Sequence, residues 1–589
     1  MNESIDIGIP QRLAHLPLVL DVLRRSGVLD VIDHAVRDDR RSKVSTSECV
    51  AVILCGVFVG HHDLWRMADR LSPYDMKTIM RDPGFELREF PEERLAKALD
   101  DLYHANLDKL MTAMAIQAIK QFRLGTDFLH FDTTSLSFFG AYEREDMFSM
   151  SDGLASGGPA PLVTFGYSKD NRGDLKQILF GSLVTRDGGV PLYGKALDGN
   201  RSDSECAAEF FQRVRSLVQD PKTVCCVADS KGWCAPVLEV IRTERLRLLS
   251  RLPRNYQLHD QIMAMDGPVR RIERPPKKKG QDPECYEIAG FDVDQTFEIR
   301  RPNGEGARAT IEHMVVPARA VRIFSGALLR KKMKTLERVR RREAVDAKRL
   351  MREWQARAYA CERDARRAIE RQTNAERFVT LDITATVEAV DGPIQRGRGR
   401  PRKRPEPEIE GRHFRVRYNA VTVTDSVSEE RLRDQATFVL IRTRSPGWTI
   451  DDADLIDRYK GQFHNEHGFA WLKSGPSHKG LNPIFLETPT RIASLCFLYV
   501  IGLMVWSLIQ RTVRKNLSAM GEGLPYHRNK PSAAITTRFL FELFPKVQTV
   551  PFRIGDGQWQ KKLVGVDDVV KLACRALGTP IGNFQPVGK

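Results

Sequence analysis

The chain shows no sign of paired cysteines. Its 589 residues include 10 cysteines, and no two of them form a Cys-x-x-Cys pair. A disulfide framework and a thioredoxin-like motif are therefore excluded, and we expect reduced cysteines in a cytoplasmic protein. Residues 1–17 contain no apolar signal region, which favours the same location. A P-loop and a His-Glu-x-x-His motif are also missing, so nothing indicates ATP use or a metalloprotease.

Acidic residues are in deficit. Asp and Glu number 76 against 92 Lys and Arg, which gives a formal net charge of +16. A basic chain favours an acidic polymer as its partner, and nucleic acid is the commonest one. Ribosomal and membrane-surface proteins share this bias, so charge alone does not identify the partner. The length of 589 residues predicts several domains with a large core.

Long uncharged runs are scarce, but one stands out. Residues 492–509, IASLCFLYVIGLMVWSLI, are long enough to cross a bilayer. The run stands alone in a basic chain and follows an amphipathic segment. A buried core helix is therefore the favoured interpretation, with membrane insertion as the alternative, and we expect no membrane partner.

Residues 1–122 have the periodicity of helices. Apolar residues three and four apart predict helices at 17–36, at 45–60 with a cap at Ser45 or Thr46, and at 91–122. The segment GHHDLWRMADRLS, residues 60–72, has the size of a helix in a small DNA-reading bundle. A plain packing helix fits that segment equally well.

From residue 125 the period changes to two. Strands are predicted at 126–140, on both sides of a hairpin at Asp187-Gly188-Gly189, at 223–229 and at 246–252, with helices between the later strands. Three consecutive strands followed by helix, strand, helix and strand predict an α/β fold, a mixed sheet flanked by helices.

Residues 256–445 interrupt this pattern. Basic Pro/Gly stretches at 270–280 and 396–408 flank strand candidates such as 378–390. Between them, a charged helix is predicted at 328–377, with a coiled-coil-like seam that includes Trp354. We interpret the region as a β-rich insertion that contains one long helix. A strand at 437–443 and an amphipathic helix at 454–475 follow it.

Three carboxylates are candidates for chemistry. Asp132 interrupts an apolar strand, Asp229 ends another, and Glu466 lies on the amphipathic helix. A carboxylate in an apolar strand is costly unless it is paired or bound to a cation; the alternative is that each Asp caps a turn at a solvated strand end. Three carboxylates from three elements would suit a pair of divalent ions in phosphoryl transfer.

The segment YKGQFHNEHGFAWLK, residues 459–473, places Tyr459, Gln462, Glu466 and Lys473 at the spacing Tyr-x2-Arg-x3-Glu-x6-Lys, with Gln in place of Arg. Together with HFDTTSL around Asp132 and VADSKGW around Asp229, it resembles the bacterial insertion-sequence transposases of the DDE type that carry this signature. The resemblance covers roughly residues 125 to 510.

The resemblance implies an RNase H-like catalytic fold and a division of the chain. Residues 1–122 would be a helical N-terminal DNA-binding domain, 123–255 and 446–520 the two parts of the catalytic core, 256–445 the insertion, and 521–589 a C-terminal helical region. Glu466 would face the sheet. Asp132, Asp229 and Glu466 would bind two Mg²⁺ ions, with Mn²⁺ as a substitute.

Family resemblance further implies DNA cleavage and strand transfer at the terminal inverted repeats of an insertion sequence, with target DNA as the second substrate. Tyr459, Gln462 and Lys473 would line the path of the DNA, and Gln462 would contact phosphate without a charge. A homodimer on DNA is expected, and the use of a DNA hairpin is left open. A catalytically silent DNA-binding derivative and a related nuclease without strand transfer are the alternatives.

The basic stretch RGRGRPRKRP contains Arg398 and Arg400 around a glycine, as in the core of an AT-hook. Arginines in such a segment enter the narrow minor groove of A·T-rich DNA. A solvated basic linker that meets phosphates without specificity is the favoured alternative.

Overall fold

The computed structural model describes residues 5–587 except for residues 40, 62, 141, 143–159, 277–281, 302–309, 374–378, 394–409, 426–428, 475–480, 482–483, 485 and 527–529. The chain divides into two compact units. The first contains residues 1–256, 292–319 and 441–589, and the second contains residues 257–291 and 320–440. The range predicted as the insertion, 256–445, thus includes residues 292–319, which belong to the first unit.

The N-terminal region of the first unit is helical. Its helices are α1 (Leu16–Arg25), α2 (Val28–Ala35), α3 (Thr46–Phe58), α4 (Met67–Leu71), α5 (Met76–Met80), α6 (Glu92–His104) and α7 (Leu107–Phe122). Ser45 caps α3 in a capping box with Glu48, which confirms one of the two predicted caps. The ranges 17–36 and 91–122 each form two helices, because the backbone turns at Gly27 and Asn106, with φ angles of 74° and 72°.

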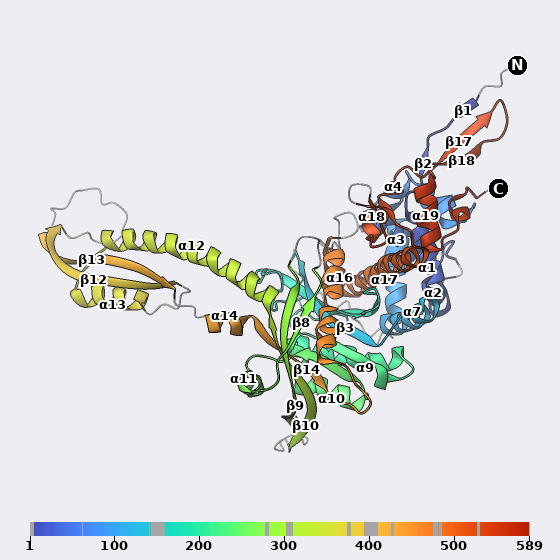
Figure 1. Cartoon of the computed structure of the whole chain (residues 1–589). Helices are drawn as coiled ribbons and strands as arrows, with labels where there is room; N and C mark the ends of the chain where they lie inside the picture. Colours follow the sequence, from blue (N-terminus) through green and yellow to red (C-terminus); the bar gives the residue numbers. More distant parts are fainter. Residues whose placement is uncertain are drawn as a thin grey trace. The chain divides into compact units, whose positions relative to one another are not determined.

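A large mixed sheet forms the centre of the first unit (Figure 1). Its strands are β3 (Phe128–Phe138), β4 (Lys176–Thr185), β5 (Pro191–Leu197), β6 (Cys225–Ala228) and β7 (Arg247–Arg251), together with the parts of β9 (Glu284–Arg301), β10 (Thr310–Ser325) and β14 (Thr437–Thr443) that belong to the first unit. They pair in the order β5-β4-β3-β6-β7-β14-β10-β9. The predicted hairpin at Asp187-Gly188-Gly189 joins the antiparallel β4 and β5. By contrast, β3, β6 and β7 run parallel.

Helices cover both faces of this sheet. They are α9 (Asp203–Leu217), α10 (Ala235–Thr243), α15 (Asp452–Lys460), α16 (Phe463–Ser474) and α17 (Pro489–Met520). Two glycines allow close approach: a Cβ at Gly181 would lie 2.5 Å from the Phe210 ring of α9, and one at Gly194 would lie 2.7 Å from Val500 of α17. Phe180, one residue from Gly181 and therefore on the opposite face, meets Phe469 of α16. The sheet is thus the middle of three layers.

The long apolar helix α17 is a core helix of the first unit. By length and composition it could cross a membrane, but 94% of its most apolar window is buried in the protein. It packs against β5 and against α1, α3 and α6. Ser494 donates a hydrogen bond to the Leu99 carbonyl at 2.7 Å, and Arg491 pairs with Asp100 at 2.8 Å. These contacts agree with the favoured interpretation of residues 492–509 as a buried core helix.

The C-terminal region differs from the helical prediction for residues 521–589. It contains α18 (Thr537–Phe541) and α19 (Asp568–Leu577), but also β15 (Leu524–Tyr526), β16 (Lys530–Ser532), β17 (Gln548–Ile554) and β18 (Gln560–Val564). β17 pairs with β18 and with the N-terminal strands β1 (Ile5–Ile7) and β2 (Gln11–Arg12). A sheet therefore joins the two ends of the chain, and no local sequence pattern announces such a long-range pairing.

The second unit combines strands with helices. Its remaining elements are α11 (Gln257–Ala264), β8 (Arg270–Arg274), α12 (Gly326–Ala356), β11 (Ala358–Tyr359), α13 (Glu362–Thr373), β12 (Val379–Pro393), β13 (Glu410–Asp425) and α14 (Glu429–Gln435). The helix predicted at 328–377 is broken, because Ala358 and Tyr359 pair with β13 and separate α12 from α13. Tyr359 and Ala365 are buried against Val416 of the same sheet. The side chain of Trp354 lies outside the described part of the chain.

Candidate active site

Asp132 lies on β3, and Asp229 directly follows β6, the parallel neighbour of β3. β3 pairs with β6 so that His130 is opposite Val227. Two residues beyond this last paired position, Asp132 on β3 and Asp229 after the end of β6 come to the same level. The two carboxylates lie close enough for the charge of Asp229 to raise the pKa of Asp132.

Asp132 is half-buried in the middle of β3, with 31% of its side chain exposed. Burial raises its pKa to about 6, and the charges of Asp229 and Asp203 act in the same direction. The Lys169 ammonium, 3.8 Å away, and the backbone N–H of Thr133, at 2.7 Å, oppose this increase. The carboxylate is incompletely compensated, and its environment favours an added cation.

Asp229 both caps a turn at the end of its strand and lies beside Asp132, the two roles that the sequence suggested for it. It follows β6 directly and caps the short 3-10 helix η3 (Ser230–Gly232), where its side chain accepts a hydrogen bond from the Lys231 N–H at 3.0 Å. Its backbone carbonyl accepts a hydrogen bond from the Ser250 hydroxyl at 2.5 Å. The turn cap is therefore present, and it fixes the carboxylate beside Asp132.

Tyr459 is placed beside the two carboxylates by α15. Burial raises its pKa to about 12, and the charges of Asp229 and Asp132 contribute, against the opposing charge of Arg251. The phenol is therefore neutral at physiological pH and is able to donate a hydrogen bond. Asp132, Asp229 and Tyr459 are the predicted site residues that the structure brings together.

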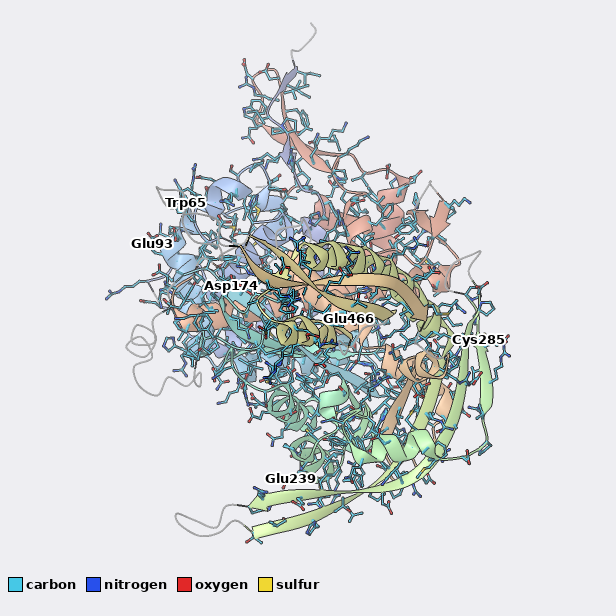
Figure 2. All side chains as sticks on the ribbon, turned by 90° about the vertical axis from the view of Figure 1, so that its left-hand side faces the viewer. Trp65, Glu93, Asp174, Glu239, Cys285 and Glu466 are labelled. Carbon is cyan, nitrogen blue, oxygen red and sulfur yellow. The ribbon has the colours of Figure 1, made fainter. Side chains whose placement is uncertain are left out.

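The segment 454–475 forms two helices, and this changes where Glu466 points. The backbone leaves α15 at Gly461, and α16 begins at Phe463. Because the break changes the phase of α16, Asn465 faces the sheet: it is 1% exposed and donates a hydrogen bond to the His130 carbonyl at 3.0 Å. Glu466 is exposed; it is labelled in Figure 2. The expectation that Glu466 faces the sheet is therefore corrected.

Gln462 and Lys473 lie at opposite ends of α16. The Gln462 amide nitrogen is buried without a hydrogen-bond partner among the described residues. Lys473 donates from its ammonium to both carboxylate oxygens of Asp170, at 2.7 and 2.5 Å. Arg398 and Arg400 lie outside the described residues.

A charged network beside the carboxylates was missed from the sequence. Lys169 lies between Asp132 and Asp203, and Lys231 also pairs with Asp203. The hydroxyl of Thr133, the residue after Asp132, donates to Asp203 at 2.5 Å. Two local signals were available: Lys169 precedes the strand that leads into the predicted hairpin, and Lys231 lies two residues after Asp229. Their shared contact with Asp203 requires the fold.

The residues present fit one magnesium ion in part. Mg²⁺ keeps several waters and needs only one or two protein carboxylates, which Asp132 and Asp229 supply. Within the described residues, however, no group of three His, Cys, Asp or Glu side chains is placed to hold a metal ion. Glu466 does not join the two aspartates in this structure, and the three-carboxylate site stays a prediction.

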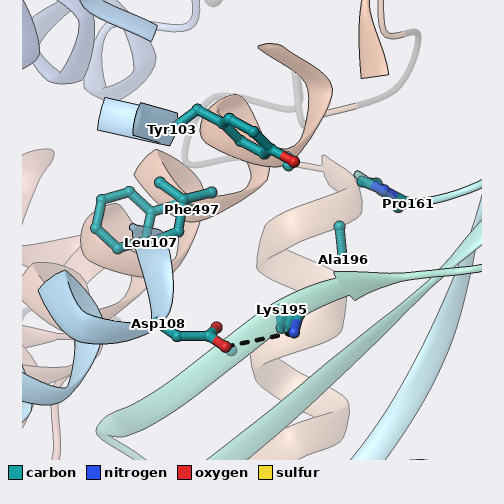
Figure 3. Close-up of a pocket in the computed structure, with 9 residues that line it drawn as sticks. Tyr103, Leu107, Asp108, Pro161, Lys195, Ala196 and Phe497 are labelled. Atoms are coloured by element: carbon teal, nitrogen blue, oxygen red, sulfur yellow. Dashed lines mark hydrogen bonds and ion pairs between the residues drawn. The ribbon is translucent and has the colours of Figure 1, made fainter. Parts of the chain in front are cut away.

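A small cavity lies elsewhere in the first unit (Figure 3). It has a volume of about 30 Å³ and is lined by residues of α6, α7, β5 and α17, including Tyr103, Asp108 and Phe497. Asp108 and Lys195 form an ion pair of 3.4 Å at its edge. This volume admits water but is far below the roughly 300 Å³ of pockets that bind small molecules, so the cavity is not a substrate site.

The comparisons with known proteins give limited information. Residues 9–116 match the family model of a domain of unknown function, DUF4277. No curated protein matches the chain. Among solved structures, the chain is similar to the piggyBac transposase synaptic complex with hairpin DNA, determined by cryo-EM, with 10% identity and a TM-score of 0.23. It is also similar to the Mos1 transposase paired-end complex with the left transposon end, with 11% identity and a TM-score of 0.13.

These structural matches are partial. They cover 53% and 36% of this chain, and 63% and 60% of the piggyBac and Mos1 chains, respectively. At such low TM-scores the likeness carries no weight for fold or function, which therefore depend on the site itself.

Proposed function

We propose that this protein is a DNA transposase of the DDE type, which cleaves and joins DNA at the terminal inverted repeats of an insertion sequence. The observation that carries the proposal is the pair of neighbouring carboxylates: Asp132 on β3, and Asp229 at the end of β6, the parallel neighbour of β3. The signature segment 459–473 adds Tyr459 beside them.

The topology around the pair supports an RNase H-like core. Strands β5, β4 and β3 are antiparallel neighbours, β6 and β7 continue parallel to β3, and helices pack on both faces. Three strands in antiparallel order followed by two parallel ones are what the resemblance implies for this catalytic fold. Asp132 stands on β3, the middle one of these five strands, and is paired there with Ser182 of β4.

In this proposal the aspartates bind the metal ion and the signature residues position the DNA. Asp132 and Asp229 would hold Mg²⁺, or Mn²⁺ in its place, and such an ion supplies charge stabilisation and an activated oxygen for an in-line displacement. Tyr459 would donate a hydrogen bond to a phosphate next to the cleaved bond, and Gln462 and Lys473 would contact the same DNA strand. By the resemblance, Glu466 would be the third carboxylate and would imply a second ion; for this role its side chain would have to turn toward the pair, which it does not join in this structure.

The proposed setting follows from the same assignment. The partners are the duplex ends of the element and the target DNA, and two ends held together require a homodimer on DNA. A cytoplasmic protein, associated with the nucleoid when bound to DNA, fits this role. Cut-and-paste movement is the proposed outcome.

The test is a cleavage assay on labelled duplex that carries a verified element end, in Mg²⁺ and then in EDTA. Wild-type protein is expected to nick the duplex and to form joined products only with Mg²⁺, and Asp132→Ala is expected to lose both. Nicks without joined products would indicate the nuclease alternative. Binding without cleavage would indicate the catalytically silent derivative.

Glu466→Gln separates chemistry from folding. Because Glu466 is exposed, the variant is expected to keep the wild-type melting temperature and DNA binding while it loses cleavage. The matched control is Asn465→Ala, which removes a buried hydrogen bond and is expected to cost about 1–3 kcal/mol of stability. Full cleavage by Glu466→Gln would remove Glu466 from the site.

A further inference from the structure

Asp203 occupies an unusual position beside the carboxylate pair. It is the first residue of α9, and only 13% of its side chain is exposed. Both of its oxygens are engaged: Oδ1 accepts from the Thr133 hydroxyl at 2.5 Å and lies 3.3 Å from the Lys169 ammonium. Oδ2 accepts from the Lys231 ammonium at 2.5 Å.

Each of the two lysines belongs to a segment that holds one of the aspartates. Lys169 lies 3.8 Å from Asp132, and its backbone N–H donates to the Ser135 hydroxyl of β3 at 2.9 Å. Lys231 follows Asp229 by two residues, in the turn that Asp229 caps. Asp203 thus binds the ammonium groups of Lys169 and Lys231. Without it, both groups are near enough to neutralise Asp132 and Asp229.

We propose that Asp203 is a positioning residue that holds Lys169 and Lys231 away from Asp132 and Asp229, and so keeps this pair available to a divalent cation. The inference rests on the proposed function, since it concerns the same carboxylates.

The physical reason is a competition for charge. An ammonium and a carboxylate attract each other at contact distance by several times the thermal energy in a partly buried environment. Without Asp203, Lys169 would keep its contacts with the Thr133 carbonyl and hydroxyl, but its nearest carboxylate would be Asp132. Lys231 would be free to turn to Asp229. Two lysines on two aspartates would oppose the entry of a cation.

The experiment measures binding of Mn²⁺ to the full chain without DNA, by electron paramagnetic resonance. Asp203→Asn is expected to weaken binding about tenfold, which equals about 1.4 kcal/mol. Glu205→Gln is the matched control, because it removes the same charge two residues further along α9, from an exposed side chain. It is expected to bind Mn²⁺ like the wild type.

Removal of a lysine distinguishes this role from a merely structural one. Lys169→Met in the Asp203→Asn background is expected to restore most of the lost affinity, and Lys169→Met alone is expected to bind Mn²⁺ more tightly than the wild type. A structural defect at Asp203 would not be repaired by a second substitution. The inference is overturned if Asp203→Asn binds like the wild type, or if the double variant stays as weak as Asp203→Asn.

The same Mn²⁺ measurement distinguishes a failure of the proposed function from a failure of the role proposed for Asp203. If the wild type binds no Mn²⁺ that Asp132→Asn removes, the carboxylate pair is not a metal site, and both proposals fall. If that binding is present but unaffected at Asp203, only the role of Asp203 is lost.

Discussion

At the scale of single residues, the candidate site contains a partly buried carboxylate, Asp132, whose ionised form is disfavoured by burial. Asp132 interrupts a strand whose other residues are buried, and the Lys169 ammonium pairs with it only at 3.8 Å. A protein that needed only stability would place an uncharged side chain there. The retained carboxylate is therefore best understood through what it binds.

The first prediction concerns the stability of Asp132→Asn. The raised pKa, about 6, means that the folded wild type holds the proton more tightly than the unfolded chain. Relative to the variant, the wild type therefore loses stability as the pH rises from about 4 to about 6. In EDTA at pH 8, Asp132→Asn is expected to be more stable by on the order of 2 kcal/mol, after allowance for the partial exposure of the group.

Thermal melts between pH 4 and pH 8 would check this. The two melting curves should approach each other at pH 4. A variant that is less stable than the wild type at pH 8 would show that the carboxylate is satisfied by protein contacts, and would remove the main reason to place a cation there.

The second prediction concerns Asp170, whose carboxylate pairs with Lys473. Asp170→Asn frees the Lys473 ammonium and removes a negative charge beside it, so binding to duplex DNA is expected to tighten. The salt dependence of the binding constant should steepen by up to about 0.9 in a log–log plot. Asp174→Asn, which removes the same charge from a pair with Arg172 in the same loop, is the matched control.

Fluorescence anisotropy at several salt concentrations would measure both variants. The gain should disappear when Asp170→Asn is combined with Lys473→Gln. An equal gain in that double variant would mean that Lys473 is not on the path of the DNA.

At the scale of elements, α12 of the second unit presents a row of cations. Arg330, Lys331, Lys334 and Arg338 are exposed and line a hollow of about 710 Å³ together with Asp282 and Glu284. Residues four apart on a helix are separated by about 6 Å along its axis and share one side. A side of this kind suits an elongated polyanion.

The third prediction follows from this row. Lys334→Gln with Arg338→Gln is expected to weaken binding to duplex DNA irrespective of its sequence, and to lower the salt slope by up to about 1.8, since each phosphate contact contributes about 0.9. The control is Arg363→Gln with Arg367→Gln, which removes two exposed charges from α13. If both double variants lose equal affinity, the effect is net charge and not a phosphate contact of α12.

The elements also show where prediction from sequence succeeds. Strands β3, β4, β5, β6, β7 and β14 appear as predicted, because apolar runs bounded by turn residues specify them locally. The breaks were not predicted: α12 ends where Tyr359 pairs with β13, and α15 ends at Gly461. Apolar positions spaced by three and four continue through both breaks, so the pattern alone cannot reveal them.

The candidate site also combines features that were predicted from the sequence with features that were not. Asp132 and Asp229 were found because a carboxylate in an apolar strand is conspicuous, and their register follows from the parallel pairing of their strands. The role of Asp203 was not predictable, since its contacts come from residues 133, 169 and 231. The direction of Glu466 was misjudged because it depends on the phase of α16 after the break.

At the scale of the whole molecule, distant parts of the chain complete the first unit. Asp75, 1% exposed, accepts hydrogen bonds from the Thr549 hydroxyl at 2.7 Å and from Thr78, and pairs with Lys561 at 2.8 Å. Burial opposes ionisation, but the contacts with Lys561 and Thr549 prevail and lower the pKa of Asp75. The N-terminal helical region is thereby fastened to β17 and β18.

The fourth prediction is that Asp75→Ala destabilises the first unit by about 2–4 kcal/mol, because the partners of a buried charge are left unpaired. Since the pKa is lowered, the difference from the wild type should be present at pH 7 and shrink as the pH falls below the ordinary value of the carboxyl. Asp69→Ala, which removes an exposed carboxylate paired with Arg66, should change stability by less than about 1 kcal/mol. Denaturation in urea at pH 7 and pH 3.5 would measure both.

The pairing of β1 with β17 has a consequence for how the protein is made. Ile5 cannot pair with Ile554, its partner in the sheet, until Ile554 has been synthesised. The same holds for the hydrogen bond between Asp75 and Thr549. At the usual pace of a ribosome, the intervening residues take on the order of a minute to emerge. During that time the early helices carry apolar surface with no permanent cover, and chaperones that shield nascent chains are expected to attend this one until its last strands arrive.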